Sequence, residues 1–240
     1  MQELRIQAYA KINLFLNVLH KRPDGYHEIE TVFQSIGLSD DIILRKLSRD
    51  IKINCEHSQV PLDESNLAYK AAKLLLEASS LSEGVEITIK KQIPVAAGLG
   101  GGSADAAAVL VGLNQLFELG YEREQLMSLG VKLGADVPFC ILGGTALGRG
   151  IGEILEPLPP LGRIWLTLVN PGFMVSTAWV YQNLHLCSKN ENLGLTKCQK
   201  NVNILIQQIR TNNLRKICDE MFNVLESVVV SKYPVVLDLK

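Results

Sequence analysis

The chain has 240 residues, 47% of them hydrophobic, with 24 Lys and Arg against 25 Asp and Glu and a formal net charge of −1. This length is enough for one large domain or two modest ones, with a core that needs no disulfide or metal. A near-neutral chain without a basic run argues against nucleic-acid binding, and no stretch reaches the ~18 apolar residues of a membrane helix. We therefore expect neither a nucleic acid nor a membrane as partner.

Strands and helices are predicted in mixed order along the chain. The predicted strands, in which apolar and polar residues alternate, cover residues 4–9, 41–47, 84–90 and 163–169. The predicted helices cover residues 66–79, 103–119 and 122–133, with two more between residues 201 and 229. Because strands and helices do not alternate strictly, the expected fold class is α+β rather than a doubly wound sheet.

A dense cluster of Pro and Gly at residues 156–162 is the best candidate for a domain boundary. It divides the chain into an expected N-terminal domain of residues 1–157 and a smaller C-terminal domain of residues 158–240. The five cysteines include no C-x-x-C pair and no zinc-ligand spacing with a His, which favours free thiols. With no secretory signal at the N-terminus either, we expect a cytoplasmic protein.

The most informative segment is a glycine-rich loop, Gly98-Leu99-Gly100-Gly101-Gly102-Ser103, between a predicted strand and a predicted helix. Four glycines in five positions let the backbone adopt positive φ and approach a ligand closely. The first turn of the following helix offers unpaired N–H groups and the positive end of the helix dipole. Together these features predict a phosphate-binding loop, with the Ser103 hydroxyl as a further phosphate or metal contact.

Other interpretations of this loop are weaker. A Walker A loop needs Gly-Lys-Ser/Thr at the start of the helix, but Gly102 is followed directly by Ser103. A dinucleotide-binding fingerprint needs a last glycine where Ser103 stands, and an acidic residue at the end of a second strand where residues 122–124 begin a predicted helix. A strand-to-helix turn without a ligand is the remaining alternative, and the number of glycines argues against it.

The pattern Pro-x-x-x-Gly-Leu-Gly-Gly-Gly-Ser-x-x-Ala-Ala at residues 94–107 resembles the central motif of the GHMP kinases, which include galactokinase, homoserine kinase and mevalonate kinase. Residues 9–16, 22–27 and 134–139 are similar to segments of the branch that acts on 4-diphosphocytidyl-2-C-methyl-D-erythritol. The resemblance implies a two-domain GHMP kinase fold. It also implies transfer of the γ-phosphate of ATP to the 2-hydroxyl of that substrate, a step of non-mevalonate isoprenoid biosynthesis.

The resemblance makes Lys11 and Asp136 the expected catalytic pair. Removal of a proton from a tertiary alcohol calls for a general base, a role that suits Asp136. A lysine beside it would keep the carboxylate ionised and stabilise developing charge. Taken alone, each residue has a structural alternative: a surface lysine on a long stem for Lys11, and a turn residue for Asp136.

The resemblance also implies the residues that contact ATP. The expected ATP-binding residues are Asn66, Lys91, Pro94, Ala96, Gly98, Leu99, Gly100, Gly101, Gly102 and Ser103. A helix cap is the structural alternative for Asn66, and a surface charge is the alternative for Lys91. Because phosphoryl transfer normally uses Mg²⁺ to screen the phosphate charge, Mg²⁺ is expected with ATP, and Ser103 is its candidate ligand.

The residues expected to contact the second substrate are Asn13, Tyr26, His27, Thr177 and Tyr181. By resemblance, Tyr26 stacks on the cytosine, His27 reads the edge of the base and Tyr181 covers its second face. Asn13 would share a strand face with the catalytic lysine two residues earlier, and both Asn13 and Thr177 are expected near the reacting hydroxyl. An exposed amphipathic residue is the structural alternative for Tyr181.

The chain departs from the family in its C-terminal part. A third, Gly- and Ser-rich motif of GHMP kinases has no counterpart between Gly162 and Lys240, and the family enzymes continue for some tens of residues. We therefore expect an incomplete C-terminal domain and weak or absent turnover. The alternative functions are another GHMP kinase of the homoserine or mevalonate type, which Tyr26 and His27 argue against, and a truncated, non-catalytic nucleotide-binding form. A monomer or weak homodimer with small-molecule partners is expected.

Overall fold

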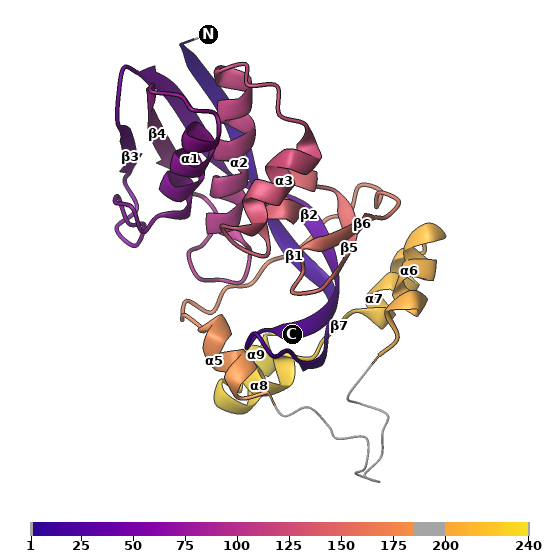
Figure 1. Cartoon of the computed structure of the whole chain (residues 1–240). Coiled ribbons are helices and arrows are strands. Elements are labelled where there is room, and N and C mark those ends of the chain that lie inside the picture. Colours follow the sequence, from indigo (N-terminus) through magenta and orange to yellow (C-terminus); the bar gives the residue numbers. More distant parts are fainter. Residues whose placement is uncertain (1, 185–199, 240) are drawn as a thin grey trace. The chain divides into compact units, whose positions relative to one another are not determined.

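The computed structural model describes residues 2–184 and 200–239, and Figure 1 shows the course of the chain. Its strands are β1 (Glu3–Lys21), β2 (His27–Leu47), β3 (Ile51–Cys55), β4 (Gly84–Lys90), β5 (Thr145–Arg149), β6 (Ile154–Pro157) and β7 (Phe222–Asn223). Its helices are α1 (Leu67–Ala78), α2 (Gly101–Leu116), α3 (Arg123–Val131), α4 (Val137–Leu142), α5 (Thr177–Gln182), α6 (Val202–Arg210), α7 (Leu214–Glu220), α8 (Glu226–Lys232) and α9 (Val235–Asp238).

The chain forms two compact units, and neither is a continuous segment. The first unit consists of Met1–Ile12 and Ser35–Gly143, and the second consists of Asn13–Gln34 and Gly144–Lys240. The long strands β1 and β2 therefore each contribute residues to both units. The domain boundary expected at residue 157 from the Pro and Gly cluster stays a prediction.

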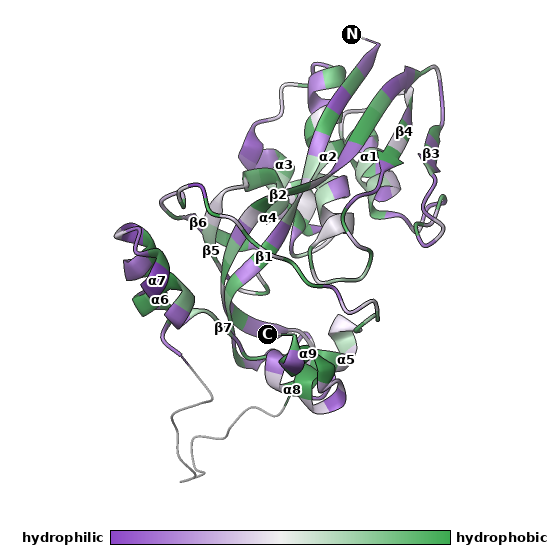
Figure 2. Ribbon diagram, turned by 180° about the vertical axis from the view of Figure 1, so that it is seen from behind, coloured by the Kyte–Doolittle hydropathy of each residue, from purple (hydrophilic) through white to green (hydrophobic). Residues whose placement is uncertain are grey.

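The first unit is a sheet covered by helices on one face. In its sheet, β2 runs antiparallel to β4, and β3 runs parallel to β4. Helices α1 and α2 lie side by side on one face of this sheet, as the two opposite views show (Figures 1 and 2). Val85, Ile87 and Ile89 are each at most 2% exposed, which confirms the alternation predicted for residues 84–90. Parallel and antiparallel pairing in one sheet agrees with the expected α+β class.

Helix α2 is buried almost all round, since small residues let it lie close to its neighbours. Ten of its 16 residues are buried, and eight of these ten are Ala, Val or Leu. A Cβ added at Gly112 would lie 2.5 Å from Cδ1 of Leu44 in β2, so only glycine fits there without displacing that side chain. The same helix buries one carboxylate, that of Asp105, which is 4% exposed. A buried charge is rare unless it is paired, so Asp105 needs a partner.

The second unit contains the other parts of β1 and β2, with three short strands. Strand β7 runs parallel to β1, β5 runs antiparallel to β2, and β6 runs antiparallel to β5. Leu16, Val18 and Ile29 form a small buried cluster against partly buried residues that include Tyr181. The second unit therefore packs Tyr181 of α5 onto the strands that carry the N-terminal motifs.

The strand predicted for residues 163–169 is wrong. This segment has no regular secondary structure, and Trp165, Leu168 and Val169 are 91%, 46% and 58% exposed. Its alternating pattern favours a strand, but a strand also needs a neighbour to pair with, and none pairs with it in the described part of the chain.

The described residues between 201 and 229 form three helices, α6, α7 and α8, where two were predicted.

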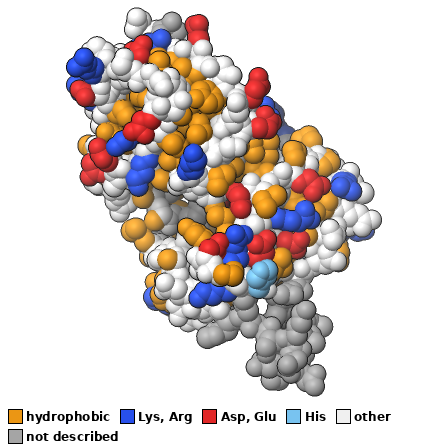
Figure 3. All heavy atoms as spheres, viewed as in Figure 1, with side chains coloured by type: hydrophobic (Ala, Val, Ile, Leu, Met, Phe, Trp, Pro, Cys, Tyr) orange, Lys and Arg blue, Asp and Glu red, His pale blue; other side chains and the backbone are white. Residues whose placement is uncertain are grey.

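The face of the molecule seen in Figure 3 carries charges of both signs. Acidic and basic side chains are interspersed on it. Three cysteines in this part of the chain are free thiols, whereas Cys187 and Cys198 lie outside it. Among the same residues, no helix combines the length and the apolar character that crossing a bilayer requires.

The start of α1 gives a first testable prediction. Asn66 is the N-cap of α1, where its Oδ1 accepts a hydrogen bond from the backbone N–H of Ala68 at 2.8 Å. Its Nδ2 donates to the carbonyl of Pro61 at 2.7 Å, and the residue is 7% exposed. Replacing Asn66 with Ala removes both bonds in a buried place, so the free energy of unfolding should fall by about 1–2 kcal/mol in denaturant titrations.

Asn201→Ala is the matched control, because Asn201 caps α6 through a single bond to the N–H of Asn203 and is exposed. Its loss should be smaller, about 0.5–1 kcal/mol. Equal losses for the two caps would contradict the role assigned to burial at Asn66.

Candidate active site

The glycine loop connects β4 to α2 in the first unit. The backbone φ angles are +56° at Ala96, +74° at Gly98 and +70° at Gly100. Positive φ costs little at the glycines but strains Ala96, so the loop holds its shape against a local preference. Gly100 is the N-cap of α2 and has no side chain that could cap the helix. The first N–H groups of α2 therefore stay available to an anion at the positive end of the helix dipole.

Lys11 of β1 lies directly against this loop. Its backbone N–H donates to the carbonyl of Leu99 at 3.0 Å. A Cβ added at Gly100 would lie 2.9 Å from Cγ of Lys11, so the lysine stem occupies the space that a side chain at residue 100 would need. The Lys11 side chain is only 9% exposed, so it does not reach the surface as the structural alternative supposed. Lys11 and the glycine loop therefore pack directly against each other.

The structure brings Lys11 and Asp136 together although 125 positions separate them in the sequence. The Nζ of Lys11 lies 3.3 Å from Oδ2 of Asp136, and the Asp136 side chain is 32% exposed. Asp136 is the N-cap of α4, but its carboxylate makes no capping hydrogen bond. An N-cap aspartate normally accepts a hydrogen bond from a backbone N–H of the first helical turn. The Asp136 carboxylate pairs with Lys11 instead of capping its helix.

Ser103 belongs to the same arrangement. A Cβ added at Gly134, two residues before Asp136, would lie 3.9 Å from Oγ of Ser103. The hydroxyl at the start of α2 and the segment that carries Asp136 are therefore neighbours. Cys140 of α4 is also close, and burial raises the pKa of its thiol to about 12, with the Asp136 carboxylate adding to the shift. That thiol remains neutral at ordinary pH.

The described residues contain no group of three or more His, Cys, Asp or Glu side chains placed to hold a metal ion. Mg²⁺ usually takes one or two protein ligands and completes its coordination with water and nucleotide phosphates. The Ser103 hydroxyl, which lies near Gly134, and the partly exposed carboxylate of Asp136, two residues further on, fit that small donor set.

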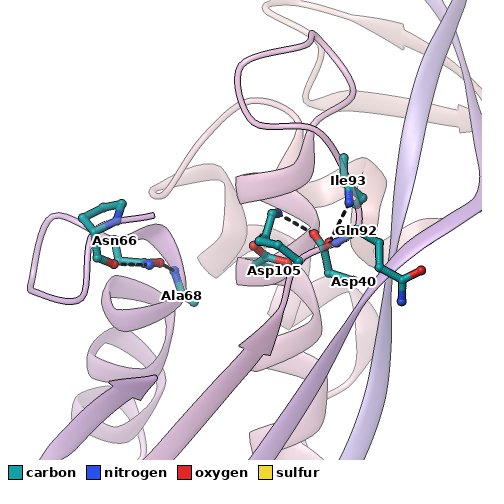
Figure 4. A network of polar contacts seen from close by, with 8 residues as sticks. Asp40, Asn66, Ala68, Gln92, Ile93 and Asp105 are labelled. Atoms are coloured by element: carbon teal, nitrogen blue, oxygen red, sulfur yellow. Dashed lines mark hydrogen bonds and ion pairs between the residues drawn. The ribbon is translucent and has the colours of Figure 1, made fainter. Parts of the chain in front are cut away.

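Lys91, which precedes the loop, belongs to a buried group of charges with Asp40 and Asp105, the two carboxylates labelled in Figure 4. Its Nζ pairs with Oδ2 of Asp40, which is fully buried, and with Oδ2 of Asp105 at 3.1 Å. The Lys91 side chain is 5% exposed, so the alternative of a surface charge is wrong. The second oxygen of Asp40 accepts the backbone N–H groups of Gln92 and Ile93.

Burial and neighbouring charges both shift the pKa values of Lys91 and Asp105. Burial lowers the pKa of Lys91, but the Asp105 and Asp40 carboxylates outweigh it and raise the pKa above its ordinary value. Burial raises the pKa of Asp105 to about 7, against the effect of Lys91 and with a further rise from Asp40. Neither Asp40 nor Asp105 was predicted from the sequence. The only signal was an aspartate within a run of alanines, which is unusual for a buried helix.

In the second unit, a chain of hydrogen bonds orients Asn13. Its Nδ2 donates to Oγ1 of Thr31 at 2.7 Å, and the Thr31 hydroxyl donates to the carbonyl of Phe15 at 2.7 Å. Thr31 is fully buried. Because Thr31 accepts from the amide nitrogen, it fixes which end of the Asn13 side chain carries the donor and which the acceptor.

The aromatic residues expected to contact the base lie in the second unit. The Tyr181 ring stacks on the imidazole of His27, with centroids 5.1 Å apart and an interplanar angle of 27°. Tyr26 is 60% exposed, and its N–H donates to the Asp24 carboxylate in the turn. Burial, together with the charge of Lys21, lowers the pKa of His27. Thr177 is the first, exposed residue of α5.

Comparisons with known proteins agree with these observations. Residues 66–144 match the family described as the GHMP kinases N terminal domain. The chain is 47% identical to 4-diphosphocytidyl-2-C-methyl-D-erythritol kinase from Acetivibrio thermocellus over 240 residues, which covers 100% of this chain and 82% of that protein. It is 48% identical to the protein of the same name from Geobacillus kaustophilus, covering 99% of this chain and 80% of that protein.

Solved structures give the same result for the fold. A crystal structure of 4-(cytidine 5'-diphospho)-2C-methyl-D-erythritol kinase matches with a TM-score of 0.74 and 34% identity, covering 98% of this chain and 81% of that one. Homoserine kinase from Cytophaga hutchinsonii matches with a TM-score of 0.68, covering 95% of this chain and 75% of that one; at 20% identity this likeness shows the fold alone. The expected GHMP kinase fold is thus confirmed, and the chain belongs to the 4-diphosphocytidyl-2-C-methyl-D-erythritol kinase branch of the GHMP kinase family.

Proposed function

We propose that this chain transfers the γ-phosphate of ATP to the 2-hydroxyl of 4-diphosphocytidyl-2-C-methyl-D-erythritol. The observation that carries the proposal is the Lys11–Asp136 pair beside the glycine loop. A phosphate-binding loop, a buried cation and a partly exposed carboxylate are the parts that phosphoryl transfer to an alcohol requires. Relatives of 45–48% identity that carry this kinase name support the same substrate.

Each part of the site has a chemical role in this proposal. The N–H groups at the start of α2 bind the phosphate oxygens of ATP and hold the nucleotide in position. Asp136 accepts the proton of the substrate hydroxyl as the oxygen attacks the γ-phosphorus. Lys11, whose Nζ lies 3.3 Å from Oδ2 of Asp136, stabilises the negative charge that develops on the phosphoryl group. Mg²⁺, when bound with ATP, screens the charge of the phosphates, with Ser103 as its proposed protein ligand.

Tyr26, His27, Tyr181, Asn13 and Thr177 are the proposed contacts to the cytidine end and to the erythritol. Tyr26, with 60% of its surface exposed, has a ring face available for a base. His27 is held by Tyr181 and has a lowered pKa, so its imidazole is mainly neutral near pH 7 and offers one donor and one acceptor to the base edge. Asn13, oriented by Thr31, and Thr177 are proposed to contact the erythritol hydroxyls.

The protein acts in the cytoplasm on small molecules, without nucleic acid or membrane, as a monomer or weak homodimer. A homoserine or mevalonate kinase is disfavoured, because those substrates have no base for Tyr26 and His27 to recognise. The assay should use enzyme in excess of substrate, so that a single turnover is measured.

The central test is phosphate transfer from ATP under single-turnover conditions, with mevalonate and homoserine as control substrates. We expect transfer to the cytidine substrate alone. Asp136→Asn should lower the rate by about 10²–10⁴-fold, because it removes the general base, and should leave the dissociation constant of ATP within about twofold. Asp219→Asn, an exposed aspartate on α7, should keep the parental rate.

The results of this assay separate the alternatives. Transfer to mevalonate or homoserine instead would identify another GHMP kinase. ATP binding without transfer to any substrate would favour the non-catalytic nucleotide-binding form.

Tyr26→Ala tests recognition of the base. Loss of one stacking contact, about 1–3 kcal/mol, should raise KM for the cytidine substrate about tenfold and leave KM for ATP unchanged. Tyr26→Phe is the matched control, since it keeps the ring and removes only the hydroxyl. An unchanged KM in the alanine variant would refute stacking on Tyr26.

Thr31→Val tests the orientation of Asn13. Valine has the same shape as threonine but cannot accept a hydrogen bond, so the Asn13 amide loses its fixed partner. We expect kcat/KM for the cytidine substrate to fall about tenfold with KM for ATP unchanged. Thr31→Ser should restore most of the loss, because serine keeps the hydroxyl; a serine variant as poor as valine would argue against this role.

A further inference from the structure

We propose that Asp40, Lys91 and Asp105 form a clamp that positions the glycine loop for ATP, with Lys91 acting through the loop rather than as a ligand of the phosphates. The proposal rests on the proposed function, because it concerns how the ATP loop of that function is held in shape. It reassigns Lys91, for which direct contact with ATP was expected.

The clamp joins the two ends of the loop to one another. At the entrance, the Asp40 carboxylate of β2 accepts the N–H groups of Gln92 and Ile93, directly before Pro94. At the exit, Asp105 lies in the second turn of α2. Lys91 connects the two, since its Nζ pairs with Asp40 and lies 3.1 Å from Asp105 (Figure 4). The residues that span positions 94 to 100 are thus anchored on both sides through a single ammonium group.

The ammonium group also touches the loop itself. A Cβ added at Gly101, the first residue of α2, would lie 3.0 Å from Nζ of Lys91. Two of the three ammonium hydrogens point to carboxylates, and the side chain is 5% exposed, so Lys91 has little freedom to turn towards a nucleotide. The position of Lys91 therefore suits a residue that supports the start of α2 better than one that contacts the phosphates of ATP.

The composition of the clamp argues that stability alone does not explain it. Two buried carboxylates share one ammonium, so one of them has no cation of its own, and burial raises the pKa of Asp105 to about 7. Oδ1 of Asp105 is moreover buried without a hydrogen-bond partner among the described atoms. An unsatisfied buried carboxylate is unfavourable for folding. Unfavourable groups of this kind are typical of functional sites, where they persist because they hold a particular geometry.

Asp105→Ala separates positioning from stability. Alanine suits the helix and removes the unbalanced carboxylate, which leaves Lys91 and Asp40 as a simple pair. We expect an unchanged or higher melting temperature, together with a dissociation constant for a non-hydrolysable ATP analogue that rises about tenfold. Hydrogen exchange at the amides of residues 95–102 should become faster, while exchange in α1 stays the same.

Two controls complete the design. Asp105→Asn keeps an acceptor for Lys91 and should restore analogue binding to within about threefold of the parent. Ile87→Val, in the buried part of β4, should lower the melting temperature without changing analogue binding. Because neither binding nor amide exchange requires turnover, these results stand whether or not the chain phosphorylates the cytidine substrate.

The outcomes that would overturn the clamp are distinct. Unchanged analogue binding and unchanged loop exchange in Asp105→Ala would show that Asp105 does not position the loop. Equal losses in the Ala and Asn variants would assign the effect to the charge of residue 105 rather than to its link with Lys91. Lys91→Met gives a second test if the variant folds. Weaker binding of the ATP analogue together with faster amide exchange in residues 95–102 supports the clamp. Weaker analogue binding with unchanged amide exchange would instead make Lys91 a direct phosphate ligand.

Discussion

The stem of Lys11 fills the place where residue 100 would carry a side chain, since a Cβ there would lie 2.9 Å from Cγ of the lysine. Gly100 also has a φ of +70°, which an L-residue rarely adopts. Glycine at this one position therefore meets two demands, a backbone turn and a close approach. Without it the loop would move away from Lys11, and the lysine would lose its bond to Leu99 and its place beside Asp136.

Two lysines of the first unit illustrate how surroundings decide what a charge does. Lys11 has a carboxylate partner, Asp136, that is 32% exposed and makes no capping bond. That partner is partly open to solvent. Lys91 is enclosed by Asp40 and Asp105, which are almost fully buried, and its raised pKa keeps it charged. A cation with such partners has a fixed position, which suits structural support of a loop better than chemistry.

The sequence predicted the parts of this protein that depend on local patterns and motifs. The strand at residues 84–90, the capped helix after Asn66 and the glycine loop follow from alternation, capping and backbone freedom. The pairing of Lys11 with Asp136 was expected only through family resemblance, because no local rule spans 125 positions. Asp105 was missed, since the 14 positions between it and Lys91 follow no single helix or strand period, and Asp40 lies a further 51 positions before Lys91. The prediction of a strand at residues 163–169 was wrong because an alternating pattern shows only the local preference of a segment. It does not show whether another strand lies beside that segment to pair with it.

The division of β1 and β2 between two units has a consequence for biosynthesis. The first unit is complete in sequence once residue 143 has been made, and its N-terminal strand segment can pair early. Residues 13–34 belong to the second unit, whose other residues begin only at position 144. During translation, this apolar hairpin, with Phe15, Val18 and Ile29 among its buried residues, stays without its final neighbours while more than a hundred further residues are added. The nascent chain therefore exposes apolar side chains of residues 13–34 for much of its synthesis. Chaperone binding and early aggregation should concentrate at this segment.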